Sequence, residues 1–120
     1  TINSKEYVYV DTQNLSKLLI GGIKQVDLAL MFSLSNNLLI NYNICLDSYG
    51  EPLNTTSIAK LINNTEQSAK RKLNRLIELG LLYYGKLNRF GKVYIINTYI
   101  VRKGKKVRVE LSELFDDIEQ

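Results

Sequence analysis

Residues 66–79 carry amide and guanidinium side chains at helical spacing, and such groups can read the edges of DNA bases. The spacing predicts a helix with one aliphatic side and one polar, basic side. The aliphatic side holds Ala69, Leu73 and Leu76, and the polar side holds Gln67, Arg71, Asn74 and Arg75. Glutamine or asparagine can form two hydrogen bonds with adenine, and arginine with guanine. The pattern therefore favours a helix that enters the major groove of duplex DNA.

A shorter helix directly precedes this one, and together they form a predicted helix-turn-helix over residues 54–80. Hydroxyl groups at residues 55–57 offer N-caps for the first helix, and an asparagine pair ends it. Thr65 offers the N-cap of the second helix, and Gly80 offers its C-terminal stop. An ordinary amphipathic helix with a solvated charged face has the same pattern, so the flanking segments must decide between the two interpretations.

The segment that follows, residues 81–97, predicts a β-hairpin with a basic tip. Aliphatic and aromatic residues fill positions 81–86 and 92–96, and turn formers lie between them. A strand predicted at residues 38–46 would join this hairpin in a three-stranded sheet. The predicted fold class is therefore α+β, a winged helix-turn-helix with a small antiparallel sheet.

The remaining segments extend this unit into one domain of 120 residues. Residues 1–53 are expected to hold an N-terminal strand over residues 5–10, a short helix capped by residue 11 or 12, and a core helix over residues 23–34. That core helix places Val26, Leu30 and Leu34 on one side. Residues 98–120 are expected to hold a basic segment and then an amphipathic helix, with apolar residues at i, i+3, i+4 and i+7. These are Leu111, Leu114, Phe115 and Ile118.

Positive charge is concentrated where DNA contact is predicted. The formal net charge is +4, yet residues 79–109 contain eight lysines and arginines and no acidic residue. Five of the 12 acidic residues lie instead within residues 110–119. A charge run by itself is usually solvated surface. Its coincidence with a predicted helix-turn-helix and hairpin indicates nucleic-acid binding.

The expected partner is double-stranded DNA, bound by the second helix and the hairpin. The expected DNA-binding residues are Thr65, Gln67, Ser68, Lys70, Arg71, Lys72, Arg75, Lys86, Arg89 and Lys92. One alternative is that the basic surface binds an acidic replication or transcription protein. Another is that aromatic rings stack on unpaired bases of single-stranded DNA or RNA. Those rings belong to Tyr83, Tyr84, Phe90, Tyr94 and Tyr99, which cross-strand packing would equally explain.

The oligomeric state is open at this point. Groove-reading proteins of this kind commonly bind two half-sites as dimers. A homodimer would use the apolar positions of residues 26–30 or of residues 111–118.

The sequence argues against an enzyme and against a cofactor or metal. It contains no histidine, which excludes Ser-His and Cys-His nucleophile pairs and histidine metal sites. It also lacks the glycine-rich loop ending in Lys-Ser or Lys-Thr that P-loop hydrolysis requires. The single cysteine, Cys45, is expected to be buried as a small hydrophobic residue, in a protein of the reducing cytoplasm. No apolar run is long enough to span a membrane.

Residues 58–82 look like the winged helix-turn-helix of many bacterial DNA-binding proteins. Several segments resemble the RepL-like replication proteins of Gram-positive plasmids and phages: residues 7–10 with Leu15 and Leu18-Leu19, the core helix and, above all, residues 93–107 with Leu114-Phe115. In that family a hairpin strand runs into an Ile-Asn-Pro-like turn and a Lys/Arg-Gly pair before a final helix. The resemblance implies a plasmid or phage protein that binds DNA and acts in replication or its control; a transcriptional regulator with the same fold is the alternative.

The chain departs from these patterns at two positions. Thr98 stands where the family often has proline, a change that is conservative for the backbone path. Asn64 occupies a position in the helix-turn-helix turn that usually carries an aliphatic residue. A polar residue there would loosen the angle between the two helices.

Overall fold

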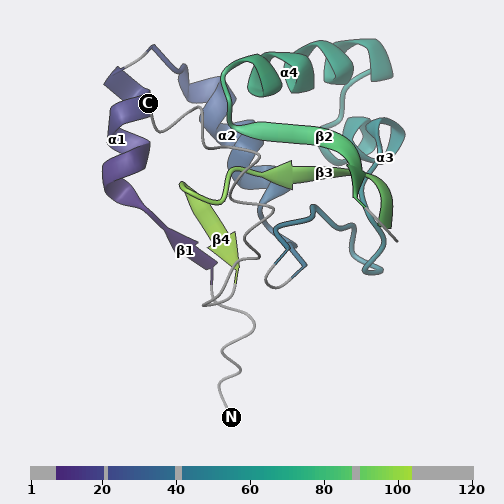
Figure 1. Cartoon of the computed structure of the whole chain (residues 1–120). Helices are drawn as coiled ribbons and strands as arrows, with labels where there is room; N and C mark the ends of the chain where they lie inside the picture. Colours follow the sequence, from purple (N-terminus) through teal and green to yellow (C-terminus); the bar gives the residue numbers. More distant parts are fainter. Residues whose placement is uncertain (1–7, 21, 40–41, 88–89, 104–120) are drawn as a thin grey trace.

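The computed structural model describes residues 8–20, 22–39, 42–87 and 90–103, which have a mixed α+β fold (Figure 1). The elements are β1 (Val8–Val10), α1 (Thr12–Ile20), α2 (Gln25–Leu34), α3 (Thr55–Leu61), α4 (Glu66–Glu78), β2 (Leu82–Leu87), β3 (Gly91–Ile96) and β4 (Val101–Lys103). The predicted C-terminal helix, the basic segment beyond residue 103, the start of the N-terminal strand and Arg89 lie outside the described residues. No helix in the described ranges is long and apolar enough to cross a membrane.

α3 and α4 form the predicted pair of consecutive helices. The N-cap of α3 is Asn54 rather than a hydroxyl residue of positions 55–57. Its side-chain oxygen accepts a hydrogen bond from the Ser57 N–H at 2.8 Å, and Ser57 Oγ accepts one from the Asn54 N–H at 2.8 Å. This reciprocal pair satisfies two N–H groups that have no partner within the helix. Thr65 caps α4, and Gly80 follows its last turn with a left-handed φ of 79°, both as predicted.

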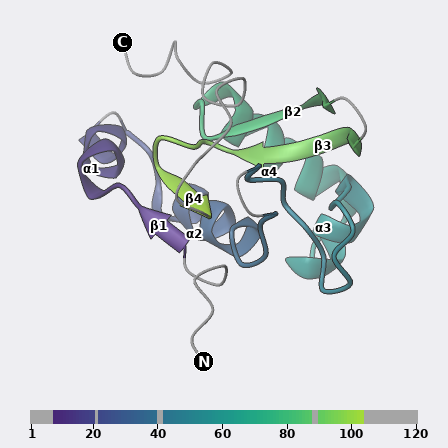
Figure 2. The ribbon, with the colours of Figure 1, turned by 60° about the horizontal axis from the view of Figure 1, so that its bottom comes forward.

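The hairpin predicted after α4 is also present, formed by β2 and β3. The two strands pair from Leu82↔Ile96 at the inner end to Leu87↔Gly91 at the outer end. The inner end packs into the core with α2, α3 and α4, and Figure 2 shows these three helices gathered around the hairpin. The inner end of the hairpin is therefore part of the core, and its outer end extends beyond the core.

The strand predicted over residues 38–46 is wrong, because the described part of this segment turns back on itself. Leu38 and Cys45 form an isolated antiparallel bridge with each other, and Asn43 between them has a left-handed φ of 56°. Left-handed backbone interrupts strand geometry, and asparagine tolerates it better than most residues. Ile44 forms an isolated bridge with Ile95 of β3. The third strand of the predicted sheet is thus reduced to this bridge.

Asn43 joins the end of β3 to the start of β4. Its buried amide donates hydrogen bonds to the carbonyls of Ile96 at 3.1 Å and Val101 at 2.6 Å. Its backbone carbonyl accepts the Ile96 N–H at 3.1 Å. Buried backbone carbonyls need hydrogen-bond partners. One asparagine side chain supplies them where the chain leaves the hairpin for the second sheet.

That second sheet consists of β1 and β4, with Val10 opposite Val101. The Asp11 N–H donates to the Ile100 carbonyl at 2.7 Å, and the Asp11 carboxylate caps α1, as predicted, by accepting two backbone N–H groups. The Asn14 amide donates to the Tyr99 carbonyl at 2.8 Å. The N-terminal strand was predicted but its partner was not, since pairing between chain ends leaves no local signal.

α2 contributes to the core as predicted, but with a different face. Leu30, Met31 and Leu34 are buried, whereas Val26 is 70% exposed. The prediction that Val26 shares the buried side is therefore wrong. At 100° per residue the buried face centres on residues 27, 30, 31 and 34, and Val26 lies at its edge. Cys45 is buried, as predicted, and burial raises the pKa of its thiol.

Substitution of Asn43 tests how much its hydrogen bonds at the end of β3 and the start of β4 contribute to stability. Asn43→Ala removes both side-chain hydrogen bonds and should lower the free energy of unfolding by about 2–4 kcal/mol in urea denaturation. Asn43→Gly loses the same bonds but relieves the left-handed backbone, so it should be more stable than the alanine variant by about 1 kcal/mol. Wild-type stability in both variants would contradict this role.

Candidate nucleic-acid interface

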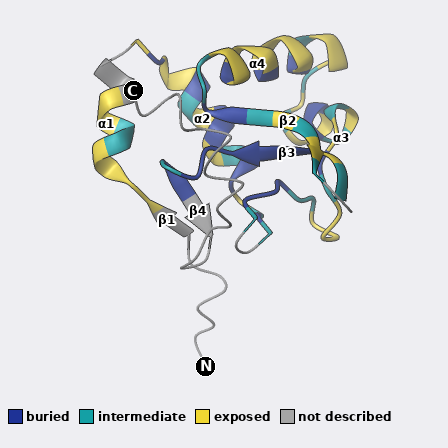
Figure 3. Cartoon of the chain, viewed as in Figure 1, coloured by how far each residue is buried: buried dark blue, intermediate teal, exposed yellow. Residues whose placement is uncertain are grey.

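α4 has one buried and one exposed side, as its sequence predicted. Ala69, Leu73 and Leu76 are buried, whereas residues 67, 70, 71, 72, 74 and 75 are exposed. Figure 3 shows this division along α4, with exposed residues on its outer side. The centre of the outer side carries Gln67, Arg71 and Asn74. An amide, a guanidinium and a second amide therefore face solvent from consecutive turns of one helix.

The start of α4 is held by hydroxyl contacts. Thr65 Oγ1 accepts the Ser68 N–H at 3.2 Å, which gives this predicted DNA-binding residue a capping role. Thr56 Oγ1 of α3 donates to Glu66 Oε1 at 2.6 Å, which links the two helices. These contacts fix the position of the first turn of α4 relative to α3.

Asn64 has a structural role that the sequence did not predict. Its Oδ1 accepts hydrogen bonds from Lys72 Nζ at 2.6 Å and from Ser68 Oγ at 3.3 Å. The residue expected to loosen the helix-turn-helix thus ties its turn to α4. Ser68 and Lys72 consequently point toward the turn, on the flank of α4 rather than on the centre of its outer side.

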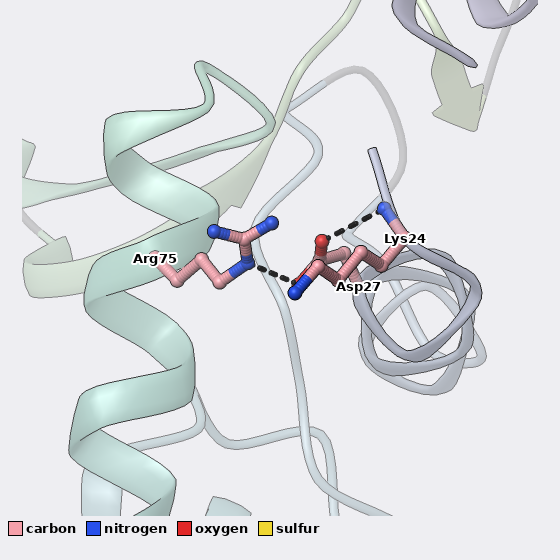
Figure 4. Close-up of polar contacts among 3 residues, drawn as sticks. All are labelled: Lys24, Asp27 and Arg75. Atoms are coloured by element: carbon pink, nitrogen blue, oxygen red, sulfur yellow. Dashed lines mark hydrogen bonds and ion pairs between the residues drawn. The ribbon is translucent and has the colours of Figure 1, made fainter. Parts of the chain in front are cut away.

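Arg75 is also engaged within the protein. Its Nε donates to Asp27 Oδ1 of α2 at 2.9 Å, and Asp27 Oδ2 accepts the Lys24 N–H at 3.0 Å (Figure 4). Asp27 is 5% exposed, and the Arg75 side chain is 44% exposed. The hydrogen bond from Arg75 lowers the pKa of Asp27 against the opposing effect of burial, and the same bond raises the pKa of Arg75. Arg75, one of the predicted DNA-binding residues, therefore joins α4 to α2 within the protein.

Asp27 was missed by the sequence reasoning. The available signal was that Asp27 is the single carboxylate of the apolar helix QVDLALMFSL. A charge on such a helix is rarely buried without a partner, so this residue indicated an ion pair. Its partner lies 48 residues away. The pairing could not be deduced from spacing.

The outer half of the hairpin brings two predicted DNA-binding residues together. Lys86 and Lys92 are exposed and lie directly opposite each other in the β2–β3 register. Like charges in this position repel each other, so an anion beside them would be favourable. The outer ends of β2 and β3 lie at the same end of the molecule as α3 and the start of α4 (Figures 1 and 2).

Most of the aromatic rings considered for base stacking pack within the protein. Tyr94 is buried, its hydroxyl lies 3.0 Å from Thr55 Oγ1, and burial raises its pKa. Tyr84 lies opposite Tyr94, with ring centroids 4.3 Å apart. Tyr84 itself is 42% exposed. The Tyr42 and Phe90 rings are also in contact, with centroids 5.2 Å apart. These contacts favour cross-strand and core packing over a stacking platform.

Comparison of the chain with protein-family models, with curated proteins and with solved structures gives no match. The features of the chain that bear on its function are therefore the geometry of α4 and of the hairpin.

The Asp27–Arg75 pair predicts an acid-sensitive contribution to stability. Because the folded pKa of Asp27 is below 3.8, the contribution should be complete above the unfolded pKa and be lost as pH falls through the folded pKa. Urea unfolding from about pH 6 to about pH 2 should give a steeper loss of stability for wild type than for Asp27→Asn. Glu51→Gln, which removes an exposed carboxylate, is the control and should keep the wild-type slope. Equal slopes for wild type and Asp27→Asn would contradict the assignment.

Proposed function

We propose that the protein is a winged-helix domain that binds duplex DNA sequence-specifically. In this proposal α4 enters the major groove, and the outer half of the hairpin contacts the adjacent sugar-phosphate backbone. The observation that carries it is the outer side of α4, where Gln67, Arg71 and Asn74 are exposed while the opposite side is buried. The protein acts by binding, and no chemical step on DNA is assigned to it.

The contacts divide by the chemistry of each side chain. Gln67, Arg71 and Asn74 have the planar donor groups that match base edges, so they are assigned to sequence readout. Lys86 and Lys92 are flexible point charges and are assigned to phosphates. Lys70, exposed on α4, is assigned to the backbone beside the groove.

The winged-helix interpretation is supported by the order of elements. A helix pair, a following hairpin and a bridge between Ile44 and Ile95 come in the chain order that is typical of this fold. The resemblance to RepL-like proteins adds a biological role in plasmid or phage replication or its control. A transcriptional regulator would use the same contacts, so the DNA sequence that the protein selects is the first quantity to measure.

The test is a selection of bound duplexes from a random-sequence library, followed by fluorescence-anisotropy titrations. Selected and scrambled duplexes are titrated at several salt concentrations. Binding to the selected duplex at least about 10³-fold tighter than to the scrambled one is expected. Equal affinities that collapse together with salt would refute sequence-specific binding.

Arg71→Ala should reduce discrimination between selected and scrambled duplexes by about 1–3 kcal/mol. The matched variant Arg71→Lys keeps the charge but loses the planar two-donor geometry. It should therefore lose discrimination while it retains more affinity for the scrambled duplex than Arg71→Ala does. Equal losses on both duplexes for Arg71→Ala would contradict the base-contact assignment.

Lys86→Ala and Lys92→Ala should each weaken binding to every duplex by a similar factor. Each should reduce the slope of log K against log salt concentration by about one. Lys17→Ala, which removes an exposed lysine of α1, serves as the control and should leave the slope unchanged. An unchanged slope in the hairpin variants would remove β2 and β3 from the interface.

A further inference from the structure

A hollow of about 550 Å³ lies between α2, the end of α3 and the flank of α4. Ala29, Leu30 and Ile62 are among its lining residues, and Val26 and Leu61 lie at its edge, 70% and 54% exposed. A second hollow of about 410 Å³ adjoins it, since both are lined by Ser33 and Leu61. We call these two adjoining hollows together the α2–α3 trough; the first has a mainly apolar lining, and the second adds polar side chains such as Asn36 and Asn37.

The charged side chains around the α2–α3 trough are mainly cationic. Lys24 and Lys72 line the first hollow, and Lys60 lines the second together with Asp47, whose carboxylate accepts the Tyr49 and Glu51 N–H groups. Asp27 is the only acidic residue among those described as lining the first hollow, and its charge is already compensated by Arg75. Among the described residues these three lysines form no ion pair with a carboxylate. An occupant that is apolar on one side and acidic on its edges would complement this surface.

The chain itself contains a segment with that chemistry. Residues 110–119, which lie outside the described ones, place apolar residues at i, i+3, i+4 and i+7, the spacing of one helical face. The intervening acidic residues are Glu110, Glu113, Asp116, Asp117 and Glu119. Helices of this type bind hydrophobic grooves through their apolar face.

We propose that the α2–α3 trough binds residues 110–119 of a second copy of this chain. Val26 and Leu61 are exposed, and an occupant from a second copy would cover them in both molecules at once. Exchange of the same segment in both directions makes a closed twofold dimer, in which each trough is filled once. The outer side of α4 carries Gln67 and Arg71 and is not part of the trough. Both copies therefore keep the surface that the proposed function requires, although the dimer itself does not depend on that function.

Disulfide trapping in the full-length chain tests the proposal. One copy carries Val26→Cys and a second, size-tagged copy carries Phe115→Cys. Cys45 is buried with a raised thiol pKa, so it does not compete. The mixture should form a mixed disulfide dimer under mild oxidation. Lys70→Cys, on the opposite flank of α4, replaces Val26→Cys as the control and should give little product.

Two trapping results would overturn the proposal. The first is a yield no greater than that of the Lys70→Cys control. The second is trapping within one copy, at high dilution, when a single chain carries both Val26→Cys and Phe115→Cys. That result would place the segment in the trough of its own chain.

Sedimentation equilibrium provides an independent measurement. Val26→Asp should raise the monomer–dimer dissociation constant at least about tenfold, because it places an acid against an acidic segment. Lys60→Glu should raise it several-fold, whereas Lys17→Glu, an exposed charge change on α1, should not. A chain that remains monomeric at all concentrations would refute the proposal and leave a different acidic protein as the occupant. DNA titrations of Val26→Asp separate the two proposals. If the proposed function fails, the protein does not bind DNA but still dimerises. If the dimer proposal fails, each copy still binds a DNA half-site.

Discussion

Burial of one side of α4 is the interaction on which the rest of the structure depends. Ala69, Leu73 and Leu76 lose almost all contact with water when α4 packs on its neighbours. A side chain of this kind contributes about 1–3 kcal/mol when buried, so the helix cannot rotate about its axis without a large loss of stability. Fixing the buried side also fixes the opposite side, which carries Gln67, Arg71 and Asn74. The core therefore sets the orientation of the proposed reading surface.

Polar contacts on the flank of α4 refine this orientation. Asp27 holds Arg75 from α2, and Asn64 holds Lys72 from the turn. Arg75 and Lys72 lie on the same helix as Arg71, but their hydrogen bonds are to other residues of the protein. A buried carboxylate that has lost its water must gain a partner, which explains why Arg75 is drawn toward α2.

The hairpin and the α2–α3 trough have different chemistry. Lys86 and Lys92 face each other on an exposed sheet surface, where a phosphate would relieve their repulsion. The trough has an apolar floor and separated lysines around it, which fit an amphipathic helix better than a polyanion. Positive charge alone does not distinguish these surfaces. The amount of apolar surface beneath the charge does.

The sequence alone determined the two helices 55–61 and 66–78, the hairpin after them and the outer side of α4, because local periodicity and turn residues encode such features. It predicted a strand at residues 38–46 and a buried Val26, and both predictions were wrong. Only the tertiary structure decided that Asn43 bridges β3 and β4, that β1 pairs with β4 and that Arg75 pairs with Asp27. Each of these contacts joins residues distant in the chain, and their free energies depend on burial, which spacing along a sequence does not specify.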